Sequence, residues 1–197
     1  MNFDSKNYKE LLIGCGKNWQ KKIVHTDRPH DWLNLTTLDN NSQHNPNVVH
    51  NLEKLPLPFA EDSFDELHAY EVLEHTGYQG DYEFFFAQFN DFYRILKPNG
   101  LLIGTAPNWN NIWAFGDPSH KRIIQKESFY FLDQEAYRQV GKTTMSDFRY
   151  LYDGDFKLIS SDVDKVCHSF ILQIIKPSRK DQILFEQKLI HTLNVAA

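Results

Sequence analysis

Cysteine is scarce in this sequence. Only two cysteines, Cys15 and Cys167, occur among 197 residues. Two cysteines cannot build the disulfide framework that stabilises many small secreted domains, and Cys15 lies inside a glycine turn. We therefore expect no structural disulfide, and a reducing compartment, the cytoplasm, as the location.

Long apolar runs and excess positive charge are also missing. No run approaches the roughly 18 to 20 apolar residues that cross a bilayer, and the first ten residues are polar where a signal peptide needs an apolar stretch. The 21 basic residues are outnumbered by 26 acidic ones, which gives a net charge of −5. We expect no membrane span and no broad electrostatic attraction to nucleic acid or anionic lipid.

The composition of the chain is that of a folded protein. Hydrophobic residues make up 41% of the chain, and 15 of the residues are Phe. This composition is typical of a dense core, and the length suits one domain. We predict a single domain over residues 1–197, with a helical tail from about 177 to 197 in which apolar side chains recur at near-helical spacing from Phe185 onward.

Strand and helix patterns alternate along the chain. Apolar stretches predict buried strands at Leu11–Ile13, around Val48–Val49, and at Leu101–Thr105 after a turn at Lys97–Gly100. Between the last two strands, Phe85, Phe89, Phe92 and Leu96 recur at helical spacing and predict a helix over Glu83–Leu96.

This alternation predicts a parallel sheet that is covered on both faces, with ligands at the carboxyl ends of its strands. Near the end of the chain, Phe156–Ser160 and Phe170–Lys176 read as two further strands that are joined closely enough for a hairpin. The sheet is therefore expected to end in an antiparallel pair.

A glycine turn follows the first predicted strand. Gly14 and Gly16 allow a sharp turn and let backbone N–H groups approach a ligand. The dinucleotide fingerprint requires a third glycine where this chain has Trp19, which makes a nicotinamide-dependent oxidoreductase a weaker alternative. Asp39, at the end of the next predicted strand and about 20 residues further on, can accept hydrogen bonds from a ribose.

These motifs resemble, in their order, those of the class I S-adenosylmethionine-dependent methyltransferases. The similar runs are LLIGCGKN, LTTLD, VVHNLEKLPLPFAEDSFDELHAYEVLEH and FYRILKPNGLLIGTAPN. The resemblance implies an α/β fold of the Rossmann-like, doubly wound type, with a mostly parallel seven-stranded sheet and an antiparallel C-terminal strand. It also implies an enzyme that uses S-adenosyl-L-methionine as its cofactor.

The resemblance assigns cofactor-binding residues position by position. It places Gly14 and Gly16 beside the methionine part of the cofactor, Asp39 at the ribose, Asn51 and Leu52 beside the adenine, and Tyr70 and Glu71 at the closing side of the pocket. Cys15 and Lys17 complete the loop, and Asn40 follows the carboxylate.

The chain departs from the family pattern at three positions. Leu12 stands where members usually have an acidic residue, Asn18 where they often have a third glycine, and Asn51 where they commonly have an aspartate. These changes keep open the alternative of a catalytically inactive cofactor-binding module that works in an assembly.

Two histidines are candidates for catalysis. His75 follows Glu74 directly, and His120 lies in the turn that begins at Gly116. An imidazole suits proton transfer near neutral pH, although a structural hydrogen bond is the better explanation for His75 and at least as good a one for His120. We expect no metal site, because the chain has neither the helical i, i+4 histidine pair nor the Cys-x-x-Cys spacing of zinc sites.

The methyl acceptor is only weakly indicated. The Asn/Asp-Pro-Pro-aromatic run of base-flipping adenine methyltransferases is replaced here by Ala69–Val72. A small-molecule acceptor is therefore favoured over nucleic acid. The aromatic-rich segment Trp109–Met145 is expected to determine specificity. The sequence does not indicate an oligomeric state.

Overall fold

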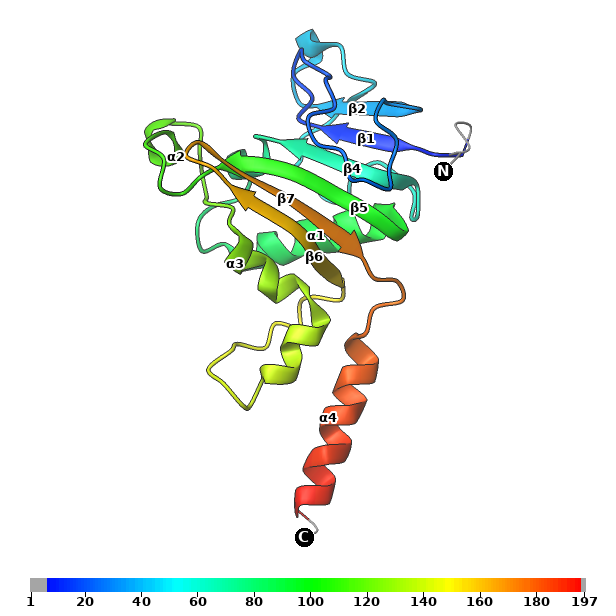
Figure 1. Ribbon diagram of the computed structural model, residues 1–197, viewed down its shortest axis with the longest axis vertical. Coiled ribbons are helices and arrows are strands. Elements are labelled where there is room, and N and C mark those ends of the chain that lie inside the picture. Colours follow the sequence, from blue (N-terminus) through cyan, green and yellow to red (C-terminus); the bar gives the residue numbers. More distant parts are fainter. Residues whose placement is uncertain (1–6, 196–197) are drawn as a thin grey trace.

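The computed structural model describes residues 7–195, apart from the side chains at positions 190, 191 and 193–195. In this part of the chain, seven strands form one sheet in the order β3-β2-β1-β4-β5-β7-β6 (Figure 1). The strands are β1 (Glu10–Ile13), β2 (Leu35–Asp39), β3 (Val48–Val49), β4 (Phe64–Tyr70), β5 (Leu96–Pro107), β6 (Phe156–Val163) and β7 (Cys167–Ile174). The strands from β3 to β5 pair in parallel, and β7 pairs antiparallel to both β5 and β6. The predicted fold class and the predicted antiparallel pair are confirmed.

The helices lie mainly beside the second half of the sheet. The α-helices are α1 (Tyr82–Ile95), α2 (Trp113–Gly116), α3 (Lys126–Phe129) and α4 (Lys180–Val195), and the 3-10 helices are η1 (Ser42–His44), η2 (Leu73–His75), η3 (Tyr130–Leu132) and η4 (Gln134–Gln139). Figure 1 shows α1 behind β5, β7 and β6, while η3 and η4 lie below the sheet.

Helix α1 forms where the phenylalanine pattern predicts it. Its buried side chains include Phe86, Phe89 and Phe92, which recur at spacings of three residues and therefore face one side. The carboxylate of Asp81 caps the helix by accepting a hydrogen bond of 3.1 Å from the Phe84 N–H. This apolar face joins the main core against one face of the sheet.

The predicted turn at Lys97–Gly100 is instead part of a longer β5. The strand begins at Leu96, and its register against β4 shifts between Phe64 and Glu66. Two steps along β4 oppose five steps along β5 here, so β5 contains three extra residues, and one residue in this stretch, Asn99, has a positive φ of 60°. The residues Lys97–Gly100 therefore interrupt the regular pairing of β5 with β4 and do not form a separate turn before the strand.

The second face of the sheet is covered, as expected, but by a segment without a helix. Among the described residues, the connection from Gly14 to Asn34 contains turns and bends but no helix. It carries Ile23 and Trp32, which pack against a small apolar cluster around Leu12 and Ile103. An irregular segment therefore covers this face.

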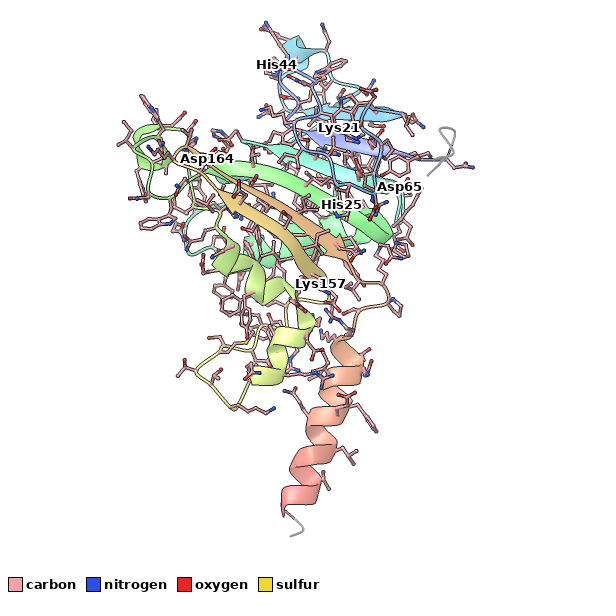
Figure 2. The ribbon with its side chains drawn as sticks, viewed as in Figure 1. Lys21, His25, His44, Asp65, Lys157 and Asp164 are labelled. Atoms are coloured by element: carbon pink, nitrogen blue, oxygen red, sulfur yellow. The ribbon has the colours of Figure 1, made fainter. Side chains whose placement is uncertain are left out.

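Buried charges hold this segment in place. Lys21, which Figure 2 labels near β1, is central to this. Its Nζ lies 2.7 Å from Glu10 Oε1 and 2.8 Å from Glu66 Oε2, and both carboxylates are fully buried. Burial opposes the ionisation of Glu66, yet His68 and Lys21 outweigh it and lower its pKa to about 2. Pairing satisfies these charges, which attach the segment to β1 and β4 at a single point.

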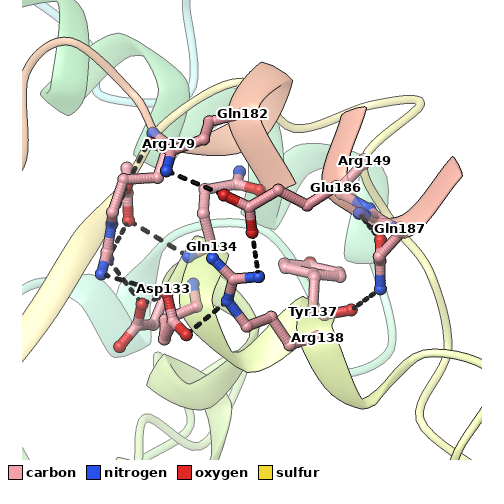
Figure 3. A network of polar contacts seen from close by, with 11 residues as sticks. Asp133, Gln134, Tyr137, Arg138, Arg149, Arg179, Gln182, Glu186 and Gln187 are labelled. Atoms are coloured by element: carbon pink, nitrogen blue, oxygen red, sulfur yellow. Dashed lines mark hydrogen bonds and ion pairs between the residues drawn. The ribbon is translucent and has the colours of Figure 1, made fainter. Parts of the chain in front are cut away.

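Helix α4 lies within the predicted tail, of which residues 196 and 197 fall outside the described part of the chain, and it extends away from the sheet (Figure 1). Arg138 of η4 forms an ion pair with Glu186, and Gln187 both accepts a hydrogen bond from Arg149 and donates one to the Tyr137 carbonyl (Figure 3). Phe185, in contrast, is 68% exposed. The helix thus docks through polar contacts on one side. Within residues 7–195, no helix is both long and apolar enough to span a membrane.

Candidate functional site

The glycine loop leaves β1 at the carboxyl end of the strand. Gly14 and Gly16 have positive φ angles of 57° and 53°. A Cβ on Gly14 would lie 2.2 Å from Cγ2 of Val72, whereas a Cβ on Gly16 would meet no described atom within 4 Å. Gly14 is therefore required by packing, and Gly16 exposes its backbone to open space that a ligand can enter.

Asp39 joins this loop at the carboxyl end of β2. Its Oδ2 accepts a hydrogen bond of 2.9 Å from the Gly16 N–H, and its Oδ1 accepts one of 2.8 Å from the Asn41 N–H. Nδ1 of His44 lies 3.2 Å from Oδ2. Burial opposes ionisation of this carboxyl group, but the N–H groups of Asn41 and Gly16, together with His44, hold its pKa below the usual range. An ionised carboxylate remains that can accept further hydrogen bonds.

The chain after β3 returns to the same corner. The His50 N–H donates a hydrogen bond of 2.9 Å to the Asp39 carbonyl. This bond brings Asn51 and Leu52 next to the end of β2. Leu52 is buried in the main core, and Asn51 accepts a hydrogen bond from the Glu53 N–H. The structure thus groups Gly14, Gly16 and the predicted adenine-side residues around Asp39, while the predicted residues Lys17 and Asn40 are exposed nearby.

Two other predicted cofactor residues direct their side chains elsewhere. Cys15 is 4% exposed and belongs to the apolar cluster on the second face, so only its backbone borders the loop. The Tyr70 hydroxyl lies 2.7 Å from Nδ1 of His68 and accepts hydrogen bonds from the N–H groups of Lys22 and Ile23. Lys22 Nζ lies 5.3 Å from the centre of the Tyr70 ring. Tyr70 therefore fastens the irregular segment to the sheet.

Glu71 directly follows β4 and has a left-handed backbone conformation, with a φ of 52°. Its N–H donates to the Thr105 carbonyl at 3.0 Å, and its exposed carboxylate accepts a hydrogen bond of 3.4 Å from Sγ of Cys167. A left-handed glutamate is uncommon, and such strained positions concentrate at functional sites. Glu71 also precedes Val72, the residue that packs on Gly14, so it lies beside the glycine loop.

The two predicted catalytic histidines meet in space. The rings of His75 and His120 contact each other edge to face, with centres 4.8 Å apart. Beside His75 lies Glu74, which is 1% exposed and is not among the predicted site residues. Burial raises the pKa of the Glu74 carboxyl to about 8. The adjacency of Glu74 and His75 was visible in the sequence, but the burial of this glutamate was not.

A cavity of about 440 Å³ opens at the amino end of α1. Because α1 returns the chain from the end of β4 to the start of β5, its amino end lies at the carboxyl edge of the sheet. The cavity does not include the predicted cofactor residues. Its lining comes from the start of α1 and from segment 122–148 and includes Tyr82, Phe85, Arg122, Ser128 and Phe131.

Comparisons with known proteins agree with this geometry. Residues 11–104 match the family model described as "Methyltransferase domain". A SAM-dependent methyltransferase from Archaeoglobus fulgidus is 15% identical, has a TM-score of 0.52, and aligns over 84% of this chain and 86% of its own. A SAM-dependent methyltransferase structure from Methanosarcina mazei is also 15% identical, with a TM-score of 0.51 over 85% of this chain and 92% of its own. At these identities the solved structures show the fold. The search of curated proteins gave no significant match.

Proposed function

We propose that this chain, whose residues 11–104 match the methyltransferase domain model, is a class I S-adenosylmethionine-dependent methyltransferase that transfers a methyl group from S-adenosylmethionine to a small-molecule acceptor. The observation that carries the proposal is the hydrogen bond between the Gly16 N–H and Asp39, which joins a glycine loop and a carboxylate at the carboxyl ends of adjacent strands. This is where open α/β sheets bind their ligands.

The residues of this corner fit the cofactor. Open space beside Gly16 admits a ligand to its backbone, and Asp39 remains ionised to accept hydrogen bonds from ribose hydroxyls. Asn51 and Leu52 would border the adenine. When bound, the cofactor supplies an activated methyl group, and the protein contributes by aligning the acceptor while excluding water.

The acceptor is proposed to enter the cavity at the amino end of α1. A volume of about 440 Å³ suits a small molecule, since ligand pockets usually measure about 300 to 1,000 Å³. The aromatic lining would cover apolar parts of such a molecule. Arg122 also lines the cavity and would place a positive charge beside an acceptor bound there. Part of this lining falls in Trp109–Met145, the segment the sequence singles out for specificity.

The unpaired state of Cys15 and Cys167 supports a reducing compartment, and we propose the cytoplasm.

The experiment that tests the function is a methyl-transfer screen. The protein is incubated with S-adenosylmethionine and pools of small molecules, and both S-adenosylhomocysteine and products heavier by one methylene group are measured by mass spectrometry. Product that depends on the protein supports the proposal. Binding of the cofactor without product over small-molecule, protein and nucleic-acid panels would instead support the inactive module.

Once an acceptor is found, Ser128→Phe tests the cavity. The larger side chain fills space at the lining, so the acceptor KM should rise while the affinity for S-adenosylhomocysteine stays the same. An unchanged acceptor KM would place the acceptor elsewhere.

A further inference from the structure

Three potential metal ligands gather beyond the end of β4. Glu74 and His75 come from η2, directly after the strand, and His120 comes from the turn after α2. One ligand atom from each residue lies within 4.8 Å of the other two. No residue spacing marks this cluster in the sequence, because its members come from two segments that are far apart in the chain.

The carboxylate of Glu74 is the most unusual group in this cluster. Its side chain is 2% exposed, and neither Oε1 nor Oε2 has a hydrogen-bond partner among the described residues. Oε1 lies 3.9 Å from Nε2 of His75. A buried carboxylate without partners is costly, because it loses its water without a replacement. Its oxygens are therefore free to bind a cation between the histidines.

Each histidine is oriented as a metal ligand requires. Nδ1 of His75 lies 3.2 Å from the Ser119 carbonyl oxygen, and Nδ1 of His120 lies 3.4 Å from the Ala114 carbonyl oxygen. A carbonyl oxygen can only accept, so Nδ1 is the donor in each ring, and in the neutral imidazole the lone pair for a metal ion is then on Nε2. This arrangement, with one ring nitrogen fixed by a carbonyl group and the other free, is typical of metal-binding histidines.

We propose that Glu74, His75 and His120 bind one divalent transition-metal ion through a carboxylate oxygen and two imidazole nitrogens. Imidazole together with carboxylate favours zinc, manganese, iron or cobalt over calcium and magnesium. Tetrahedral ligands about 2.1 Å from a common ion lie about 3.4 Å apart, so side-chain movements that close the widest ligand separation, 4.8 Å or less, by up to roughly 1.4 Å complete the site.

The surroundings allow an ion to enter and leave room for another ligand. The His75 side chain is 36% exposed, so an ion can reach the site from solvent, while the largely buried side chains of His120 and Glu74 form its inner side. Asp117 Oδ2 lies 3.8 Å from Nε2 of His120 and can supply a fourth ligand or hold a bound water. Three protein ligands with an open position are typical of metal sites that bind a substrate or water.

Direct metal binding tests this inference without methyl transfer. Protein stripped with a chelator is titrated with Co²⁺, Mn²⁺ and Zn²⁺ in the absence of cofactor, by visible absorption for Co²⁺ and by calorimetry for all three. One ion per chain is expected. Glu74→Gln, which preserves size, and His75→Gln, which changes a partly exposed residue, should each weaken binding at least tenfold.

His30→Ala is the matched control, since His30 is exposed and lies outside the cluster. Circular dichroism shows whether each variant is folded. Two cluster variants are used so that the test still stands if one of them does not fold. The inference is overturned if none of the three ions binds stoichiometrically, or if both cluster variants bind as tightly as His30→Ala. Because the assay needs neither cofactor nor acceptor, its failure would leave the proposed methyl transfer untouched.

Discussion

The backbone N–H of Gly16 donates a hydrogen bond of 2.9 Å to Oδ2 of Asp39. This contact joins the loop after β1 to the end of β2. The contact positions the glycine loop and the Asp39 carboxylate to bind the same ligand, because the carboxylate is held ionised and the glycine backbone faces open space. The proposed cofactor site is therefore largely formed before a ligand arrives.

Replacement of Asp39 should weaken cofactor binding. Asp39→Asn keeps the size of the side chain but removes the negative charge of the carboxylate that would accept hydrogen bonds from the ribose hydroxyls. Hydrogen bonds to charged groups contribute about 1.5 to 3 kcal/mol, so the affinity for S-adenosylhomocysteine should fall about 10- to 150-fold. Equilibrium dialysis measures this change. Asp31→Asn, at an exposed position, is the control, and equal affinities of the two variants would exclude Asp39 from the site.

The two loop glycines should respond differently to alanine. Both have positive φ, which costs an alanine about 1 to 2 kcal/mol. Gly14→Ala adds a clash with Val72 and should lower the free energy of unfolding by a further 1 to 3 kcal/mol or so, whereas Gly16→Ala should mainly impair ligand binding. Urea denaturation measures both. Val72→Ala should partly rescue Gly14→Ala, and the absence of any rescue would contradict this explanation.

Much of the fold could be predicted because its signals are local. The phenylalanine spacing determined α1, and two apolar stretches separated by a short polar one determined the β6–β7 hairpin. The covering of the second face could not be predicted, since it depends on ion pairs between Lys21 and carboxylates on β1 and β4. Such pairs leave no periodic pattern in a sequence.

The candidate site likewise has residues that sequence patterns predict and residues that they do not. The glycine loop and Asp39 follow strand ends, which sequence patterns locate. The Tyr70 side chain lies on the second face of the sheet because its hydroxyl is hydrogen-bonded there to His68 and to two backbone N–H groups. Glu74 is notable only because it is buried. Both depend on contacts that form only after folding.

The buried charge of Glu66 should make stability depend on pH. Its pKa is about 2 in the folded protein against 4.5 as the ordinary value. A lowered pKa stabilises the fold above pH 4.5, and this contribution is lost as the pH falls from about 4.5 toward 2. The pKa difference corresponds to about 3 kcal/mol.

Urea denaturation between pH 6 and pH 3 tests this prediction. Glu66→Gln should unfold more easily than the unchanged protein at pH 6, and the difference between them should shrink as the pH falls. Glu61→Gln, at an exposed position, serves as the control. A difference that stays constant over this range would show that Glu66 does not stabilise the fold through its charge.

Loss of the Tyr70 hydroxyl should loosen the irregular segment. Tyr70→Phe removes the acceptor of the Lys22 and Ile23 N–H groups, so amide hydrogen exchange at these two residues should accelerate. The free energy of unfolding should fall by about 1 to 3 kcal/mol. Tyr130→Phe, on a half-exposed ring, is the control. Unchanged exchange at Lys22 and Ile23 would mean that other contacts hold the segment.

The central claim is that the corner formed by Gly16 and Asp39 binds S-adenosylmethionine. Calorimetric titration of the purified protein with S-adenosylhomocysteine, and separately with NADH, tests it most directly. The account predicts saturable binding of S-adenosylhomocysteine at one site per chain and no binding of NADH. Tight binding of NADH with none of S-adenosylhomocysteine would contradict it.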